Sequence, residues 1–246
     1  MINSIIDILQ LSHSYADGTK SIHHLNLRIN PGESVAIIGP NGAGKTSLFL
    51  CLAGLVSFQA STFNISGINA LEGNNKSLLP SKAALLFQDS DDQLFCPTVE
   101  EDIAFGPMNQ GLSKSEVKQR VEIALEEVGL LEKRTKVPHQ LSGGEKRRAA
   151  LAGLLAMNPD ILLLDEPSQF LDHRSRRSLI NILNKNTHTK LIATHDFEMA
   201  LETCTRAILL DQGKIFADGP AKTILSDASL LSNHGMEVPY SQKLNR

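Results

Sequence analysis

The stretch that most constrains the fold of this chain is GPNGAGKT, residues 39–46. It follows the short apolar run SVAII and precedes SLFLCLAGL, a run with helical character. The spacing matches the pattern G-x-x-x-x-G-K-[ST], with Gly39, Gly44, Lys45 and Thr46 at the fixed positions. A strand, a glycine-rich loop and a helix in this order predict a cradle for nucleotide phosphates, the alternative being a glycine-rich turn that matches by chance.

The residue types of this loop suit phosphate binding. Glycines let consecutive backbone N–H groups point at phosphate oxygens, Lys45 supplies positive charge to the β and γ phosphates, and Thr46 offers a hydroxyl to Mg²⁺. The residues expected to bind the nucleotide here are Gly39, Pro40, Asn41, Gly42, Ala43, Gly44, Lys45, Thr46 and Ser47.

Two adjacent carboxylates end a second apolar run, ILLLDEP, at residues 161–167. After a buried strand, Asp165 is placed to hold Mg²⁺ through its water shell and Glu166 to polarise an attacking water. Adjacent acids at a strand end could instead cap the next helix. Because the loop and the acid pair occur together, we favour a site for a nucleotide with Mg²⁺.

Apolar periodicity predicts an α/β fold. Several of the expected strands are continuous apolar runs, which indicates burial on both faces of a largely parallel sheet. The expected strands are Ile5–Leu11, Leu25–Ile29, Ser34–Ile38, Ala83–Phe87, Ile161–Leu164, Lys190–Thr194 and Ala207–Leu210.

An amphipathic helix is expected over Ser113–Leu131, inserted into this core. Ser113 and Glu116 have capping-box spacing at its start. Its expected buried face comprises Val117, Val121, Ala124, Leu125 and Val128.

Composition limits the class of partner. The 24 Lys and Arg nearly balance the 27 Asp and Glu, so no broad basic field predicts nucleic acid as a partner. Three distant cysteines, Cys51, Cys96 and Cys204, argue against a disulfide framework and suit a reducing cytosol. Since no apolar run reaches the roughly 18 residues that span a bilayer, we expect a chain that is soluble on its own.

A further motif, LSGGE at residues 141–145, narrows the class of nucleotide-binding protein, because the glycine-rich loop alone does not separate kinases, GTPases and ATPases. LSGGE about twenty residues before the acid pair, with GPNGAGKT upstream, resembles the ATP-binding cassette (ABC) family. The resemblance covers the chain from about Ile5 to Gly219.

The resemblance implies an α/β fold of the P-loop NTPase, ABC ATPase type. Such a fold has a mainly parallel core sheet, an antiparallel β subdomain and an inserted helical subdomain. We therefore expect a single ABC ATP-binding domain over residues 1–226, with the helical subdomain at about 96–158, and a short C-terminal tail over 227–246.

Family resemblance also implies roles for residues outside the loop. Ser142, Gly143 and Gly144 of the signature, with Glu145 beside them, would act on the γ-phosphate bound to a second subunit, so that two ATP molecules lie between two chains. Asp172, in SQFLD, matches the aspartate of the D-loop.

Three single residues match the family's contacts with ATP. Gln88 matches the Q-loop glutamine of the Mg²⁺ and water region, and His195 matches the switch histidine. Tyr15 matches the aromatic residue that stacks on adenine. A lone Gln or Tyr at such a position could be merely structural.

The implied catalytic residues are thus Glu166, His195 and Gln88, and the implied Mg²⁺ ligands are Thr46, Gln88 and Asp165. The chain departs from the usual family pattern at Thr46-Ser47, where the order is reversed, and at Gln169 and Phe170, where many members have small residues.

The segment FQDSDDQLFCPTVEEDIAFGP, residues 87–107, resembles a narrower group, the ATPases of energy-coupling factor (ECF) importers for vitamins or transition-metal ions. Ser90 stands where that group usually has proline. The acids Glu100, Glu101 and Asp102 also suit a helix N-terminus. Near the end, LLSNHGMEVP, residues 230–239, resembles the cobalt and nickel members.

The resemblance therefore implies an ATP-hydrolysing subunit at the cytoplasmic face of the cell membrane that energises a cobalt or nickel importer. Its expected partners are an integral-membrane coupling protein, a membrane substrate-binding subunit and a second ABC ATPase, in a homodimer or heterodimer. The alternatives are a vitamin ECF importer, another ABC transporter, a soluble ABC ATPase outside transport, and a regulator that binds ATP without hydrolysing it.

Overall fold

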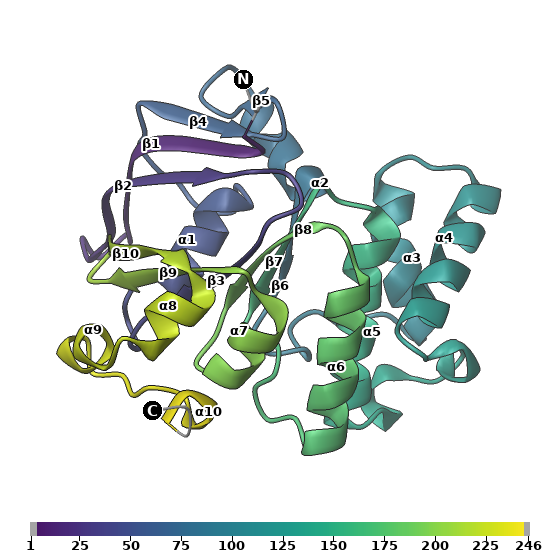
Figure 1. The fold of residues 1–246 in the computed structure, drawn as a ribbon. Helices are drawn as coiled ribbons and strands as arrows, with labels where there is room; N and C mark the ends of the chain where they lie inside the picture. The colour runs from purple at the N-terminus through teal and green to yellow at the C-terminus, as the bar shows by residue number, and fades with distance from the viewer. Residues whose placement is uncertain (1–3, 244–246) are drawn as a thin grey trace. The chain divides into compact units, whose positions relative to one another are not determined.

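The computed structural model describes residues 4–243, so the first three residues of the expected domain and the last three of the expected tail lie outside the described residues. The chain forms two compact units, which Figure 1 shows in ribbon form. The first contains the residues up to Leu85, Asp160–Glu166 and the residues from Thr187 onward. The second contains Leu86–Pro159 and Pro167–Asn186.

The first unit is built on two sheets. An antiparallel sheet has the strand order β2-β1-β4-β5 and consists of β1 (Ile6–Ser14), β2 (Lys20–Ile29), β4 (Thr62–Ile65) and β5 (Ile68–Asn69). The other sheet has the order β10-β9-β3-β8-β7-β6 and consists of β3 (Ser34–Ile38), β6 (Ala83–Leu86), β7 (Ile161–Asp165), β8 (Thr189–Ala193), β9 (Arg206–Asp211) and β10 (Lys214–Pro220).

Parallel pairing dominates the centre of the six-stranded sheet, as the continuous apolar runs predict. Strand β3 pairs in parallel with β8 and β9, and β7 pairs in parallel with β8. Every residue of β7 and β8 is buried. Parallel strands place their carboxyl ends at one edge, so the loops that follow β3, β7 and β8 emerge together there.

The helices of the first unit are short and follow these strands. They are α1 (Lys45–Leu52), α2 (Leu79–Lys82), α7 (Phe197–Thr203), α8 (Ala221–Ser226), α9 (Ala228–Asn233) and α10 (Tyr240–Lys243), with one 3₁₀ turn, η1 (Asn75–Leu78).

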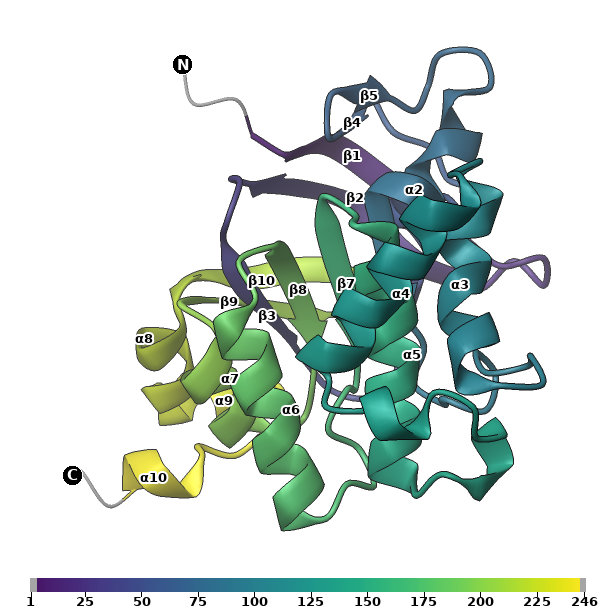
Figure 2. The ribbon, with the colours of Figure 1, turned by 90° about the vertical axis from the view of Figure 1, so that its right-hand side faces the viewer.

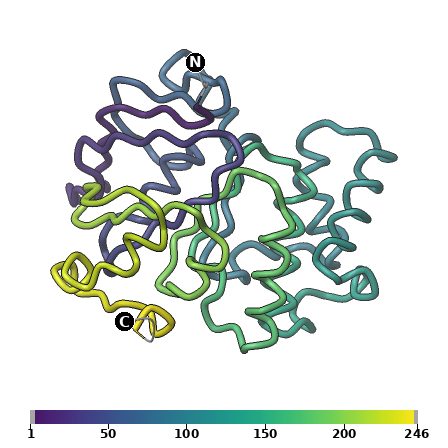
Figure 3. Tube along the Cα trace, viewed as in Figure 1, coloured from purple at the N-terminus to yellow at the C-terminus, as the bar shows by residue number. Residues whose placement is uncertain are grey.

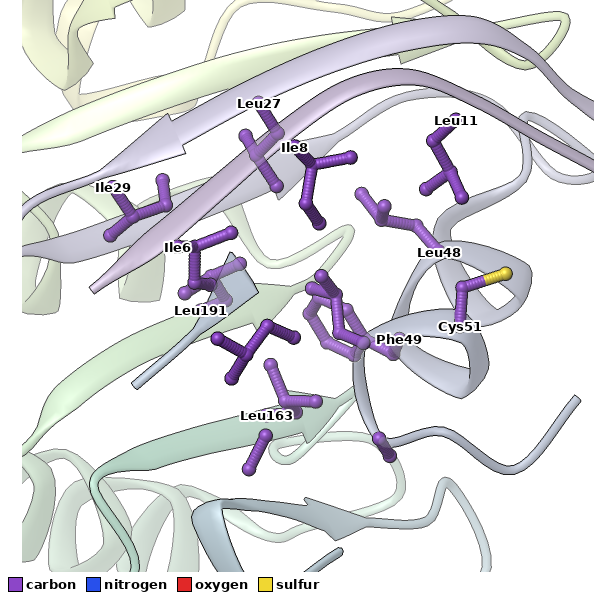
Figure 4. Close-up of a cluster of buried hydrophobic side chains, with 14 of the residues drawn as sticks. Ile6, Ile8, Leu11, Leu27, Ile29, Leu48, Phe49, Cys51, Leu163 and Leu191 are labelled. Carbon is purple, nitrogen blue, oxygen red and sulfur yellow. The ribbon is translucent and has the colours of Figure 1, made fainter. Parts of the chain in front are cut away.

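Helix α1 fills the core between the two sheets (Figure 4). Its side chain Phe49 is fully buried and points toward the same interior as Ile6 and Ile8 of β1 and Leu163 of β7. Cutting a buried phenylalanine back to alanine typically costs about 3 to 5 kcal/mol. Packing therefore fixes the helix that begins at Lys45.

Four helices dominate the second unit: α3 (Val99–Asn109), α4 (Lys114–Glu127), α5 (Gly143–Met157) and α6 (His173–Lys185), with 3₁₀ turns η2 (Leu131–Lys133) and η3 (Pro138–Gln140). Helices α3, α4 and α5 pack against one another (Figure 2). The five apolar residues of the predicted α4 face are all buried, and the predicted capping box is present. The helix ends earlier than expected, at Glu127, because Gly129 takes a positive φ of 67°.

The acids at the start of α3 occupy its first turn, behind the N-cap Thr98. This confirms that they suit a helix N-terminus, where carboxylates interact favourably with the helix dipole.

The C-terminal segment folds onto the first unit (Figure 3). Helix α8 contacts β9 and β10, and Leu231 of α9 is fully buried. His234 lies 2.7 Å from Asp211 at the end of β9. Ser241 donates from its backbone N–H and its hydroxyl to the carboxylate of Glu198 in α7.

Several strand bounds differ from the sequence prediction. Strand β1 extends to Ser14 and β2 begins at Lys20, so the two form a longer hairpin than their apolar runs indicated. Strands β4, β5 and β10 were not predicted, because β4 (TFNI) is not a continuous apolar run, β5 has only two residues, and β10 is partly exposed along its whole length. The three cysteines are free, which confirms the absence of disulfides.

Candidate functional site

The glycine-rich loop joins the end of β3 at Ile38 to the start of α1 at Lys45. A Cβ atom on Gly39 would lie 1.9 Å from the backbone oxygen of Leu210, so only glycine fits at this close approach. The N-cap of α1 is Gly44, which offers no side chain to the first backbone N–H groups of the helix. Those groups remain available for an anion, as a phosphate cradle requires.

Lys45 lies folded within its own loop. It is 7% exposed, and its ammonium donates to the backbone oxygens of Gly39 (2.8 Å) and Pro40 (3.0 Å). Burial lowers its pKa, while the charges of Glu166 and Asp165 act in the opposite direction. The backbone oxygens of Gly39 and Pro40 thus hold the Lys45 ammonium within the loop that the motif predicts to bind phosphate.

Thr46 and Asp165, two of the expected Mg²⁺ ligands, meet directly. The Thr46 hydroxyl donates to Asp165 Oδ2 over 2.7 Å, although the two residues are 119 positions apart. Asp165 is 4% exposed. A hydroxyl and a carboxylate side by side form the hard oxygen donor set that Mg²⁺ prefers, so the residues fit the ion.

Glu166 follows β7 in a strained backbone conformation, with a φ of 45°. Positive φ in a residue other than glycine costs of order 1 kcal/mol or more and is concentrated at functional sites. The Glu166 N–H donates to the backbone oxygen of Ala193 at the end of β8. This bond fixes where the carboxylate points.

The carboxylate of Glu166 faces His195. Oε2 accepts the His195 backbone N–H at 3.1 Å, and Oε1 lies 3.2 Å from Nε2 of the imidazole without forming a hydrogen bond. Burial raises the pKa of Glu166, and burial with the charge of Lys45 lowers the pKa of His195. The shift of the carboxyl favours a role as a base, and the shift of the imidazole favours its neutral form.

The alternative role for the acid pair, capping the next helix, is not what the structure shows. Helix α6 is capped by Asp172, whose Oδ1 accepts the Ser175 N–H at 2.7 Å. This bond is the first cause of the lowered pKa of Asp172.

Tyr15 lies on the turn between β1 and β2 and is 44% exposed. Its hydroxyl is 2.7 Å from the hydroxyl of Ser47 in α1. The structure therefore brings Tyr15 into contact with the phosphate-loop helix and leaves part of the residue accessible.

In the second unit, the signature sequence forms the start of α5. Ser142 is the N-cap and exchanges hydrogen bonds with Glu145 in a complete capping box. The bonds that the Ser142 N–H and hydroxyl donate to the Glu145 carboxylate lower its pKa, and this carboxylate also lies 3.5 Å from Lys133. The Glu145 side chain thus caps the start of α5, whereas the backbone of Gly143 is exposed.

Gly144 packs against α6. A Cβ atom at this position would lie 2.1 Å from the hydroxyl oxygen of Ser175. The second glycine of the signature is therefore required for helix packing. Through Ser175, the signature helix and the cap residue Asp172 are neighbours in one unit.

Gln88 also belongs to the second unit, where its amide donates to the side chain of Gln169 at 2.7 Å. Arg147 of α5 donates to the backbone oxygens of Phe87, at 2.7 Å, and of Gln88. The next position after Gln169, Phe170, is 93% exposed with a φ of 60°.

Two supporting residues escaped the sequence prediction. Gly213, in the turn between β9 and β10, donates its N–H to the backbone oxygen of Ala43 and so tethers the loop. Arg147 anchors the segment of Gln88. The DQG turn between two strands was a usable signal for Gly213, whereas nothing local marks Arg147, because its partners lie about sixty positions away.

Comparison with known proteins agrees with the resemblance to the ABC family. Residues 22–169 match a family model described as ABC transporter. The chain is 41% identical, over 98% of its length and 78% of the relative's, to the energy-coupling factor transporter ATP-binding protein EcfA of Methanothermobacter thermautotrophicus.

Two solved structures are similar in fold. One is cbiO1 of Clostridium perfringens, described as part of the ABC transporter complex cbiONQ, with a TM-score of 0.83, 29% identity and coverage of 99% of both chains. The other is a dimeric ATP-binding cassette in a post-hydrolysis state with ADP and Pi, with a TM-score of 0.76, 25% identity and coverage of 88% of this chain and 98% of the other.

Proposed function

Because the chain belongs to the ABC transporter family, whose ATPases couple ATP hydrolysis to transport, we propose that it energises an importer of the ECF type that carries cobalt or nickel ions. The observation that carries the catalytic part is the convergence of Lys45, Thr46, Asp165, Glu166 and His195 within one unit. The ECF part rests on the EcfA relative and on the segment 87–107.

In this proposal the phosphates of ATP lie on the loop N–H groups and the Lys45 ammonium, with adenine against Tyr15. Mg²⁺, when bound, neutralises phosphate charge, and Thr46 and Asp165 would hold it. A role for Gln88 in this shell rests on the family resemblance alone.

Hydrolysis in this proposal depends on the carboxylate of Glu166, which accepts a proton from the attacking water. His195 is neutral, so one ring nitrogen is able to donate to the γ-phosphate. The backbone bonds of Glu166 and His195 hold the two side chains in place before ATP arrives.

The proposed assembly contains two ABC ATPases, as a homodimer or with a related chain. Dimerisation is supported by the dimeric cassette of similar fold and by the exposed signature backbone at Gly143. The signature of one chain then acts on ATP bound by the other.

A hollow of about 390 Å³ between α3 and α4 supports docking to a membrane partner. Its lining combines apolar residues such as Met108, Val117 and Val121 with charged residues of both signs: Glu100, Glu101, Lys114, Lys118 and Arg134. A lining that combines apolar and charged side chains suits a short amphipathic helix of a coupling protein.

Within residues 4–243 no helix is both long enough and apolar enough to cross a membrane. We propose a peripheral position at the cytoplasmic face of the cell membrane, held by the coupling protein. The cargo proposal rests on the resemblance of residues 230–239 to cobalt and nickel members, a vitamin importer being the other cargo class.

The test is to purify a tagged chain from detergent-solubilised membranes of its own host and to identify the co-purifying chains by mass spectrometry. We expect an integral-membrane coupling protein and a membrane substrate-binding subunit. Recovery of soluble partners alone would overturn the transport assignment.

A matched pair of variants tests the docking surface. Met108→Glu changes an exposed methionine in the lining of the hollow, and Ile123→Glu changes an exposed apolar residue of α4 outside that lining. We expect only Met108→Glu to lose the membrane partners. Equal recovery with both variants would show that the partners dock elsewhere.

A further inference from the structure

His13, near the end of β1, occupies an unusual position for a buried histidine. It is 5% exposed, and its Nδ1 lies 2.6 Å from the backbone oxygen of Ser57. Because a carbonyl oxygen only accepts, Nδ1 carries the proton and donates. The other ring nitrogen, Nε2, is buried without a hydrogen-bond partner.

The ring of His13 meets the ring of Tyr15. Their centroids are 5.0 Å apart and their planes cross at 74°, an edge-to-face arrangement. Aromatic pairs of this geometry stabilise each other beyond simple burial. The hydrogen bond to Ser57 prevents the histidine ring from turning, so the ring is a fixed surface for Tyr15.

Tyr15 is therefore held at several points. Its hydroxyl contacts Ser47, its ring contacts His13, and its backbone closes the turn through bonds with Gly18 and Thr19. Nevertheless 44% of the residue stays exposed. A ring that is fixed on one side and open on the other is a preorganised stacking surface, which loses little side-chain entropy when a planar base binds.

We propose that His13 is a positioning residue for the nucleotide base, acting through Tyr15. This inference rests on the proposed role of Tyr15 in binding adenine. It adds that His13 holds the Tyr15 ring in the position in which a nucleotide base stacks on it. The unpaired Nε2 is not needed for this task, whereas the Nδ1–H bond to Ser57 is, so a phenylalanine at this position keeps a ring but loses the bond that fixes it.

The test compares two ligands on purified full-length chain by titration calorimetry: ATP, which has a base, and inorganic tripolyphosphate, which has none. For His13→Leu, which keeps apolar packing but removes the ring, we expect ATP affinity to fall about two- to tenfold. Affinity for tripolyphosphate should not change. His13→Phe, which keeps a ring without the bond to Ser57, should bind ATP more tightly than His13→Leu and less tightly than the wild type.

Three outcomes would overturn the inference. One is unchanged ATP affinity in His13→Leu, and another is an equal fall for both ligands, which would mark a purely structural role. The third is an ATP affinity of His13→Phe no higher than that of His13→Leu, which would show that the ring contact does not contribute. Tyr15→Ala separates this inference from the function on which it rests, because unchanged ATP binding in that variant would remove the adenine platform itself.

Discussion

The buried carboxylate of Glu166 leads to a prediction about stability as well as turnover. Glu166 is 7% exposed, and Oε1 has no hydrogen bond. In Glu166→Gln the amide oxygen keeps the His195 N–H, and the amide nitrogen is able to donate to the neutral imidazole. Removing one unsatisfied buried polar group is worth about 1 to 3 kcal/mol. For a chain of this size that corresponds to roughly 2 to 12 °C in Tm.

The gain in stability of Glu166→Gln over the wild type must increase as pH rises. Burial raises the pKa of Glu166 above its ordinary value of 4.5, so above pH 4.5 the folded protein keeps a proton that the unfolded chain has released. The stability that this provides is complete below pH 4.5 and is lost as pH rises through the folded pKa. We therefore expect the variant to match the wild type near pH 4 and to exceed it at about pH 7.

Scanning calorimetry of both proteins from about pH 4 to pH 8 measures this difference. Glu145→Gln is the matched control, because hydrogen bonds from Ser142 lower the pKa of Glu145 from its ordinary value of 4.5. Its stability contribution is present above pH 4.5 and is lost as pH falls, so this variant should be less stable than the wild type at about pH 7, with a gap that narrows in acid.

The rate of ATP hydrolysis tests Glu166→Gln independently of its stability. ATP binding should persist in Glu166→Gln while hydrolysis falls about 10²- to 10⁴-fold. A stability gain that is the same in acid and at neutral pH would refute the assignment of a raised pKa. Hydrolysis near the wild-type rate would refute Glu166 as the group that polarises water.

Two further substitutions test the geometry of the loop. Thr46→Val removes the hydroxyl that donates to Asp165, a hydrogen bond to a charged group worth about 1.5 to 3 kcal/mol of stability. The same substitution should weaken the binding of MgATP more than the binding of ATP in EDTA. The control Thr46→Ser, measured in parallel, should retain the stability and the MgATP affinity of the wild type. Gly39→Ala forces a Cβ against the Leu210 oxygen and should destabilise the fold by about 1 to 3 kcal/mol in thermal unfolding. A cost no larger than that of Gly42→Ala, whose Cβ meets open space, would contradict the close approach of Gly39 to Leu210.

Local patterns predicted the central parts of the fold well. Strand β3 has the expected bounds, and the start of α4 has the expected capping box, because both features depend on residues close in sequence. The partly exposed β10 lacks an apolar run and was missed for that reason.

In the candidate site, too, some residues were predictable from local sequence patterns and others were not. Its chemically distinctive residues, such as Lys45 and Glu166, were predicted from motifs. The residues that hold them in place were not, since the bonds of Gly213 and Arg147 and the ring contact of His13 become visible only once distant segments meet.

The central claim is that ATP hydrolysis at Glu166 drives import. It is tested most directly by ATP-dependent uptake of radioactive cobalt or nickel into vesicles that contain this chain and its co-purified membrane partners. The account predicts uptake with the wild-type chain and none with Glu166→Gln. Uptake undiminished by that substitution would contradict the coupling, and hydrolysis without uptake of either metal would contradict the proposed cargo.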